Sequence, residues 1–266
     1  MDTNNHFYGK YYKFISDDNF VLACILSHAN EGDMLQAITP AGSFFIEDTT
    51  SVIVTDNVVS FNIQIPELTV KGELTLGELH PLKKNVMGVF EYLPLECKHT
   101  IYSMFHSING ELEINGKKHT FTDSLGYIEG DEGTNFPQKY IWYNSVTKGY
   151  TATMAIATIP MLGFINFVGI LCFIKTPTDE YYLCTYNGAK VEQITNGEIA
   201  IKKGKYRFEL TFDDLNGFEL KAPVKGDMKR YIKECVTIPT HLKFTEGDKV
   251  LIDNNDEISS LEFMWD

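Results

Sequence analysis

Alternation of apolar and polar residues, the pattern of a half-buried β-strand, recurs along this 266-residue chain. The clearest case is residues 111–121, where alternating residues lie on both sides of Asn115-Gly116. Asn-Gly accepts the positive φ angles of a two-residue hairpin turn, so we predict a β-hairpin here. Further Asn-Gly pairs, which mark other candidate turns, begin at Asn109, Asn187, Asn196 and Asn216. No long stretch combines helical spacing with helix caps, and the chain is predicted to be nearly all β.

One stretch, from Gly149 to Ile174, carries no charge and is long enough to span a bilayer as a helix. It contains Thr, Pro and Gly residues throughout, and its middle, Ile159-Pro-Met-Leu-Gly163, has the composition of a turn. We therefore predict two buried strands joined at that turn, and no integral membrane segment. Over the whole chain Val, Ile and Thr, which suit a pleated sheet, outnumber the helix formers Ala and Leu.

An internal repeat predicts two halves of the same fold. The matching segments are Lys10–Ser16 with Lys139–Ser145, Phe20–Leu26 with Tyr150–Ile156, and Phe61–Leu68 with Phe208–Leu215. A boundary between His119 and Gly126 gives an N-terminal half, residues 1–122, and a C-terminal half, residues 123–266. Each half has room for a small antiparallel barrel, and about eight strands leave an interior that holds one small ligand. A two-sheet sandwich is the structural alternative.

The charge of the chain narrows the classes of partner. With 23 Lys and Arg against 36 Asp and Glu, the net charge is −13, which argues against nucleic acid and anionic membranes as main partners. The five cysteines form no C-x-x-C pair, and the first residues lack a signal-peptide profile, so we expect a reducing, cytoplasmic setting. The sequence leaves the oligomeric state open.

The sequence contains none of the common metal-binding or nucleotide-binding motifs. The seven histidines show neither H-x-H nor H-E-x-x-H spacing, and the glycines match neither a P-loop nor G-x-G-x-x-G. G-x-S-x-G, the mark of a hydrolase nucleophile, is also missing. We predict a protein without metal or cofactor.

Two segments, residues 87–106 and 126–145, mix carboxylates with many aromatic residues. A carboxylic acid walled by rings has its pKa raised by desolvation, which makes it a proton donor near neutral pH. Aromatic faces also stabilise a developing carbocation. The combination suits acid-initiated chemistry on an apolar olefin, with the acids reaching into a barrel interior. The alternative is that Glu129, Asp131 and Glu132 cap a Gly-rich connection and face water.

These segments resemble the tocopherol cyclase family, within the lipocalin-like superfamily that also contains carotenoid 1,2-hydratases. The matching motifs extend over nearly the whole chain and keep the family's order. They are Tyr8-Gly-Lys-Tyr-Tyr-Lys-Phe14, Leu93-Pro-Leu-Glu-Cys-Lys-His99, Gly126-Tyr-Ile-Glu-Gly-Asp-Glu-Gly-Thr-Asn-Phe-Pro-Gln-Lys-Tyr-Ile-Trp142, Ala155-Ile-Ala-Thr-Ile-Pro160, Cys184-Thr-Tyr-Asn-Gly-Ala-Lys190 and Leu220-Lys-Ala-Pro-Val-Lys-Gly-Asp-Met228.

The resemblance implies two lipocalin-like barrels and a cofactor-free reaction. In that reaction a prenyl double bond is protonated and a phenol oxygen then closes a chroman ring. It implies Asp131 as the first candidate for the acid and Glu129 as the second. The matching polar and aromatic positions that would bind the substrate are Glu96, His99, Trp142 and Asn144.

The sequence departs from the family where Glu132 replaces a Trp and Lys98 a Tyr. Glu132 either shares a proton with its neighbour or points outward. Three hypotheses follow for the function. The protein binds a prenylated or polyene-like apolar molecule and cyclises or isomerises it by protonating a double bond, or it is a non-catalytic carrier of such a ligand. Alternatively, the interior is filled by its own side chains and the protein acts through its acidic surface.

Overall fold

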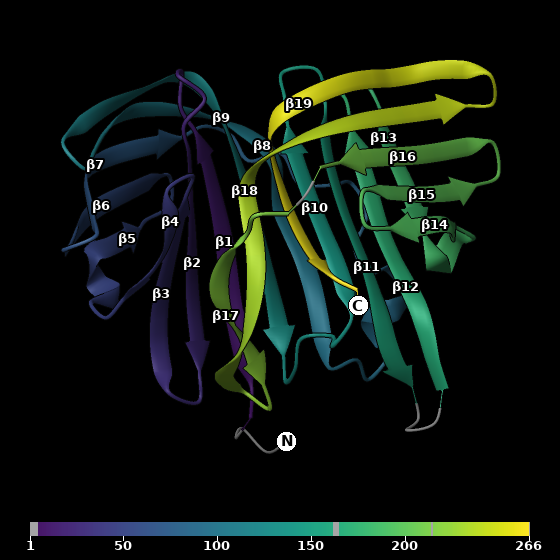
Figure 1. Ribbon diagram of the computed structural model, residues 1–266, viewed down its shortest axis with the longest axis horizontal. Coiled ribbons are helices and arrows are strands. Elements are labelled where there is room, and N and C mark those ends of the chain that lie inside the picture. Colours follow the sequence, from purple (N-terminus) through teal and green to yellow (C-terminus); the bar gives the residue numbers. More distant parts are fainter. Residues whose placement is uncertain (1–4, 162–164, 214, 266) are drawn as a thin grey trace. The chain divides into compact units, whose positions relative to one another are not determined.

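The computed structural model describes residues 5–161, 165–213 and 215–265. Within these residues the only helices are short 3-10 turns, at η1 (Thr49–Ser51), η2 (Gly88–Tyr92) and η3 (Thr185–Asn187). The strands form two large antiparallel sheets (Figure 1), which confirms the all-β prediction. Over the described residues, no helix has the length and apolar character needed to cross a membrane.

The first sheet has the strand order β4-β3-β2-β1-β9-β8-β7-β6-β5. The bounds are β1 (Phe7–Ile15), β2 (Val21–Ala29), β3 (Gly32–Thr39), β4 (Gly42–Ile46), β5 (Val52–Val54), β6 (Val58–Ile65), β7 (Leu68–Leu76), β8 (Cys97–Ile114) and β9 (Lys117–Gly133). Alternate residues of these strands form one apolar core, which includes Phe14, Phe61 and Leu74.

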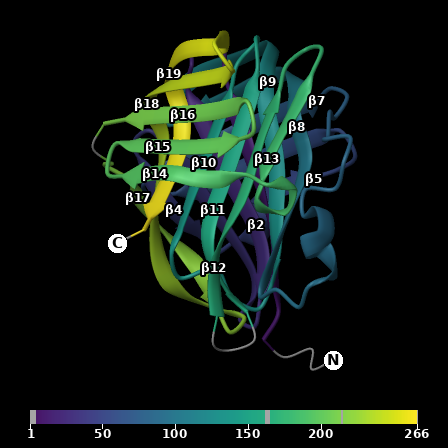
Figure 2. The ribbon, with the colours of Figure 1, turned by 90° about the vertical axis from the view of Figure 1, so that its right-hand side faces the viewer.

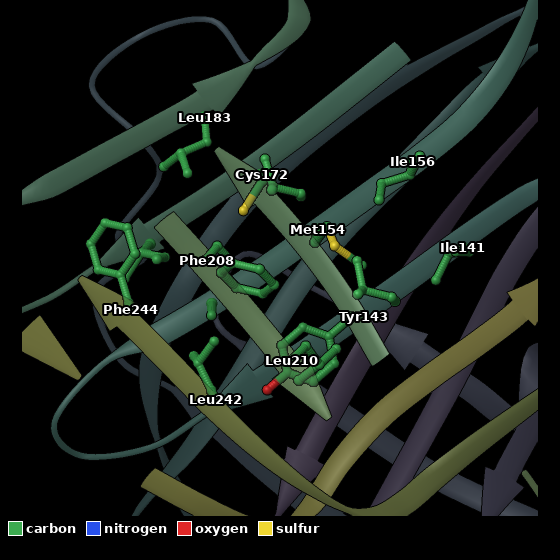
Figure 3. Packing of buried hydrophobic residues seen from close by; sticks show 14 of the residues in the cluster. Ile141, Tyr143, Met154, Ile156, Cys172, Leu183, Phe208, Leu210, Leu242 and Phe244 are labelled. Carbon is green, nitrogen blue, oxygen red and sulfur yellow. The ribbon is translucent and has the colours of Figure 1, made fainter. Parts of the chain in front are cut away.

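The second sheet has the order β13-β12-β11-β10-β19-β18-β16-β15-β14, and β17 pairs with β18 outside this path. The bounds are β10 (Tyr140–Val146), β11 (Thr151–Met161), β12 (Ile165–Lys175), β13 (Glu180–Cys184), β14 (Lys190–Thr195), β15 (Glu198–Lys203), β16 (Tyr206–Phe212), β17 (Phe218–Val224), β18 (Asp227–Glu246) and β19 (Lys249–Met264). Its own apolar core contains Tyr143, Phe208 and Phe244, whose side chains converge between the strands (Figure 3).

The two strand orders correspond, with β10, β11, β18 and β19 in the places of β1, β2, β8 and β9. The first two sequence matches fall on corresponding strands, β1 with β10 and β2 with β11. The third match falls on β6 and β7 in the first sheet but on β16 in the second. Since β16 corresponds to β7 alone, the third match does not relate equivalent residues. The closure of either sheet into a barrel stays a prediction.

Two compact units divide the chain. The first contains Met1–Asn85, Glu96–Phe136 and Phe218–Tyr231, and the second contains Val86–Leu95, Pro137–Gly217 and Ile232–Asp266. These limits differ from a single boundary at residues 122–123, because β9 continues through those residues while it pairs with β1 on one side and β8 on the other.

The uncharged stretch forms the two strands predicted for it. β11 and β12 pair in antiparallel register from Thr151 with Lys175 to Met161 with Ile165, and Figure 2 shows the two strands side by side. The residues of β11 that face the core are Ala152, Met154 and Ile156. Residues 162–164 of the predicted turn lie outside the described residues.

Asn-Gly pairs have two different roles in this fold. Asn115 and Gly116 form the turn between β8 and β9 with φ angles of 50° and 76°, as predicted. Asn196-Gly197 likewise joins β14 to β15. Asn109-Gly110 lies inside β8, where a Cβ on Gly110 would stand 2.3 Å from the Glu73 carbonyl oxygen. The turn prediction is wrong there, because this glycine permits a close approach of two backbones.

We expect Gly72→Ala to lower the free energy of unfolding by about 2 kcal/mol or more. Gly72 has φ 137°, and its Cβ would stand 2.2 Å from the Glu111 carbonyl oxygen. Gly149→Ala is the matched control, since the nearest atom to its Cβ would be Thr147 Oγ1 at 3.9 Å. We expect that variant to stay within about 0.5 kcal/mol of wild type in denaturant unfolding. Equal stability of the two variants would contradict the argument.

Candidate active site

Strand β9 places Tyr127, Glu129 and Asp131 on one face, because successive strand residues point to opposite faces. Ile128, between them, belongs to the apolar core of the first sheet. The two carboxylates therefore point away from that core, and the expectation that they reach into the barrel interior is wrong. Glu129 is nevertheless only 5% exposed. The alternative that it caps a turn and faces water is also wrong, since it lies within a strand.

Strand β8 brings His99 to these carboxylates. In the register of β8 with β9, His99 lies opposite Asp131 and Ile101 lies opposite Glu129. His99 Nδ1 is 3.0 Å from Asp131 Oδ1, and His99 Nε2 is 3.4 Å from Glu129 Oε2. The side chains of His99, Glu129 and Asp131 are 11%, 6% and 24% exposed. One ring thus bridges two carboxylates, with Asp131 nearest to solvent.

Burial by itself lowers the pKa of His99, but the charges of Glu129 and Asp131 and the hydrogen bond to Asp131 outweigh it and raise the pKa to about 9. His99 is therefore an imidazolium at neutral pH. In that state Nδ1–H donates to Asp131, and the cation compensates the buried charge of both carboxylates. We call His99, Glu129 and Asp131 the acid cluster.

Two further side chains donate to the acid cluster. The Tyr127 hydroxyl donates to Glu129 Oε2 at 2.5 Å, and Cys97 Sγ donates to Asp131 Oδ1 at 3.6 Å. Burial raises the pKa of Cys97 well above its usual value, and the negative charge of Asp131 adds a smaller rise, so this residue is a neutral thiol. Each carboxylate therefore has a neutral donor in addition to His99.

An apolar group borders the acid cluster within the first unit. Phe7, Ala29 and Met228 are buried together, and Met34, Cys97 and Phe136 pack against them. Cys97 belongs to this group and also contacts Asp131, so it joins the apolar and acidic parts.

Met228 reaches this group because the segment 218–231 returns to the first unit. The Gln36 side chain donates to the Lys221 carbonyl and accepts from the Lys221 amide, at 3.1 and 2.8 Å. The carboxylate of Glu31 accepts from the Met228 amide at 3.1 Å. These bonds fix the segment against β3 and the turn before it.

Three predicted residues are not members of the acid cluster. Glu96 is exposed and immediately precedes β8; its carbonyl accepts from the Thr134 amide at 2.7 Å. Trp142 and Asn144 lie on β10 in the second unit, where both are buried. They alternate with residues of the second core and so point away from it. Of the six predicted site residues, His99, Glu129 and Asp131 are brought together.

Sequence reasoning missed Tyr127 and Cys97 as members of the site. Tyr127 was open to inference, because Tyr127, Glu129 and Asp131 share the two-residue period of a strand. Cys97 required the pairing of β8 with β9. The same period decides the role of Glu132, which is exposed and points to the face opposite Asp131. Of the two alternatives for Glu132, the outward one is confirmed.

The acid cluster also has the spacing of a cation site, since one ligand atom from each of its residues lies within 4.8 Å of the others. A metal ion there would have to displace a contact of His99, because both ring nitrogens face carboxylates.

A separate cavity of about 560 Å³ in the first unit is lined by Phe45, Asn62 and Gln64 among others. None of the predicted site residues lines it.

No protein-family model and no curated protein sequence matches the chain. Solved structures match over nearly its whole length. Kievitone hydratase from Nectria haematococca is 10% identical, with a TM-score of 0.53 over 98% of this chain and 90% of its own. An AttH-type protein from Nitrosomonas europaea is 8% identical, with a TM-score of 0.56 over 100% and 94%. CghA bound to Sch210972 is 7% identical, with a TM-score of 0.59 over 98% and 89%.

Identities this low show the fold alone. They show that this chain shares the all-β fold of these three proteins.

The raised pKa of His99 links stability to pH. Its folded value of about 9, against about 6.5 when unfolded, corresponds to about 3 kcal/mol of unfolding free energy. Because the folded pKa is the higher one, this stabilisation is complete below pH 6.5 and is lost as the pH rises through 9. In denaturant unfolding, we expect the unfolding free energy of wild type to fall by this amount between about pH 6.5 and 9. We expect the His99→Gln variant to show no such fall from this residue. A His99 titration near pH 6.5 by NMR would contradict this.

Proposed function

We propose that the protein binds a prenylated or polyene-like apolar molecule and cyclises or isomerises it by protonating a double bond. The observation that carries the proposal is the acid cluster: an imidazolium held by two carboxylates beside a buried apolar group. The sequence resemblance to tocopherol cyclases and the fold shared with kievitone hydratase and CghA support it. In hydration and in ring closure by a hydroxyl group, addition across a double bond begins with proton transfer to carbon.

The geometry favours Asp131 as the group that meets the substrate. It is the most exposed member of the acid cluster, and it contacts Cys97 at the edge of the apolar group. His99 holds the proton in the resting state and passes it from Nδ1 to Asp131 Oδ1, from which it moves to the substrate carbon. Glu129, held by Tyr127, keeps its negative charge near the ring and so compensates the transfer.

The proton balance closes without an outside reagent. The double bond gains a proton and becomes a carbocation, and the hydroxyl oxygen of the substrate attacks that carbon. The oxygen then releases its own proton, which returns to the acid cluster. Phe7 and Phe136, with ring centroids 5.5 Å apart in an edge-to-face contact, supply aromatic surface beside the site. The proposed reaction therefore uses no cofactor.

The remaining predictions, on substrate binding and on localisation, are kept as parts of this proposal. Glu96, Trp142 and Asn144 are proposed to contact the substrate. The five cysteines are free thiols, which supports a reducing, cytoplasmic setting.

We expect Asp131→Asn and His99→Gln each to lower turnover of a prenylated hydroquinone by about 100-fold or more, the usual contribution of a positioned acid. Ring closure leaves the mass unchanged, so the product is followed by chromatography. Glu113→Gln is the matched control, because it alters an exposed carboxylate on the same strand as His99. Wild-type rates in Asp131→Asn would remove this residue as the acid. Stoichiometric binding without turnover by wild type would identify a carrier instead.

The pH dependence of the rate gives a separate test. Since the pKa of His99 is about 9, the protonated form persists through neutral pH. We expect kcat to fall as the pH rises through about 9, and we expect this limb to be absent from the residual activity of His99→Gln. A rate that already falls near pH 6.5 would contradict the role of His99.

A further inference from the structure

A row of five residues crosses the face of the first sheet that carries the acid cluster. The strand register places them next to one another from β3 to β8, in the order Met34, Ser27, Gly9, Asp131 and His99. Leu26 and Leu35, the neighbours of Ser27 and Met34, pack in the apolar core, so the row lies on the opposite face. Only β1, where the row has no side chain, separates Ser27 from Asp131.

Ser27 carries a buried hydroxyl that the protein leaves unpaired. The residue is 8% exposed, and its Oγ has no hydrogen-bond partner in the described part of the chain. A buried hydroxyl without a hydrogen bond is unfavourable, because folding has removed the water that solvated it. A ligand oxygen that bonds to Ser27 would remove this penalty.

Gly9 leaves a strip of bare backbone between this hydroxyl and the acid. The residue is half-buried, and it is not among the glycines with positive φ, so its backbone conformation does not require glycine. A Cβ on Gly9 would stand 3.4 Å from Ser27 Cβ, an ordinary contact. The protein therefore has room for a side chain here, and rotation about the Cα–Cβ bond of Ser27 can turn its hydroxyl toward this strip.

We propose that Ser27 binds a substrate oxygen remote from the double bond, and that the ring between them lies over Gly9. This role rests on the proposed function, in which Asp131 protonates the double bond. Adjacent strands are about 4.8 Å apart, so about 10 Å separates the backbones at Ser27 and Asp131. One six-membered ring with a polar contact at each end fits that distance. Phe7 and Met34 of the neighbouring apolar group supply the wall beside it.

Ser27 is then a specificity-determining residue. It favours a substrate with a second oxygen, across the ring from the oxygen that closes the new ring. A substrate without this oxygen leaves the Ser27 hydroxyl buried and unpaired, and a site of that kind discriminates strongly against it.

The test compares two unreactive probes whose saturated chains cannot be protonated: isopentylhydroquinone, and the isopentylphenol that lacks the oxygen across the ring. Calorimetry with the full chain measures both affinities. We expect wild type to bind the hydroquinone at least tenfold more tightly, and Ser27→Ala to bind the two probes equally. Without ligand, we expect Ser27→Ala to be at least as stable as wild type in denaturant unfolding, because it loses an unpaired buried hydroxyl.

Two further variants separate binding from folding. Ser124→Ala is the matched control, since Ser124 is 7% exposed and its hydroxyl donates to Asp17. We expect it to lower stability and to keep the wild-type preference between the probes. Gly9→Ala fits the protein but places a methyl group on the strip. We expect it to weaken binding of both probes at least tenfold with no loss of stability.

Four outcomes would overturn the role of Ser27: no binding of either probe, equal affinities in wild type, an unchanged preference in Ser27→Ala, or a loss of stability in that variant like that of Ser124→Ala. The probes need no turnover, so the two proposals fail separately. Ring closure of a prenylated hydroquinone without any preference between the probes would reject the role of Ser27 alone. A preference that Ser27→Ala abolishes, in a protein that leaves the prenylated hydroquinone unchanged, would support this role and reject the proposed reaction.

Discussion

The site depends on one interaction, the imidazolium of His99 held between Glu129 and Asp131. Strand alternation places the two carboxylates on one face of β9, and the register of β8 places the ring between them. A buried cation of this kind is stable only with its compensating anions, and two buried carboxylates likewise need the cation. Loss of the charge on any one of the three groups therefore leaves an uncompensated buried charge on the others.

Local patterns in the sequence predict much of the fold. The turn at Asn115-Gly116 and the strand pair in the uncharged stretch both follow from short-range physics: the φ angles that a residue accepts, and the apolar and turn composition of a segment. The acids of the site were found because carboxylates among aromatic residues form an unusual environment. Their shared face also follows from the two-residue spacing of Glu129 and Asp131.

The features that could not be predicted from the sequence depend on contacts between residues far apart in the chain. His99 and Asp131 meet only through the register of two long strands, which β-bulges shift at several points. The face that the acids occupy depends on which residues of β9 join the core. Gly110 looked like part of a turn because its close approach to Glu73 involves a strand far away in the sequence. The return of residues 218–231 to the first unit has no local signal either.

The central claim is that a proton from the acid cluster reaches a substrate carbon. Turnover of a prenylated hydroquinone in D₂O tests it most directly, because a proton delivered from an exchangeable side chain becomes a deuterium bound to carbon. The account predicts one non-exchangeable deuterium per product, located by NMR at the carbon that was protonated. Product formed in D₂O without carbon-bound deuterium would contradict it.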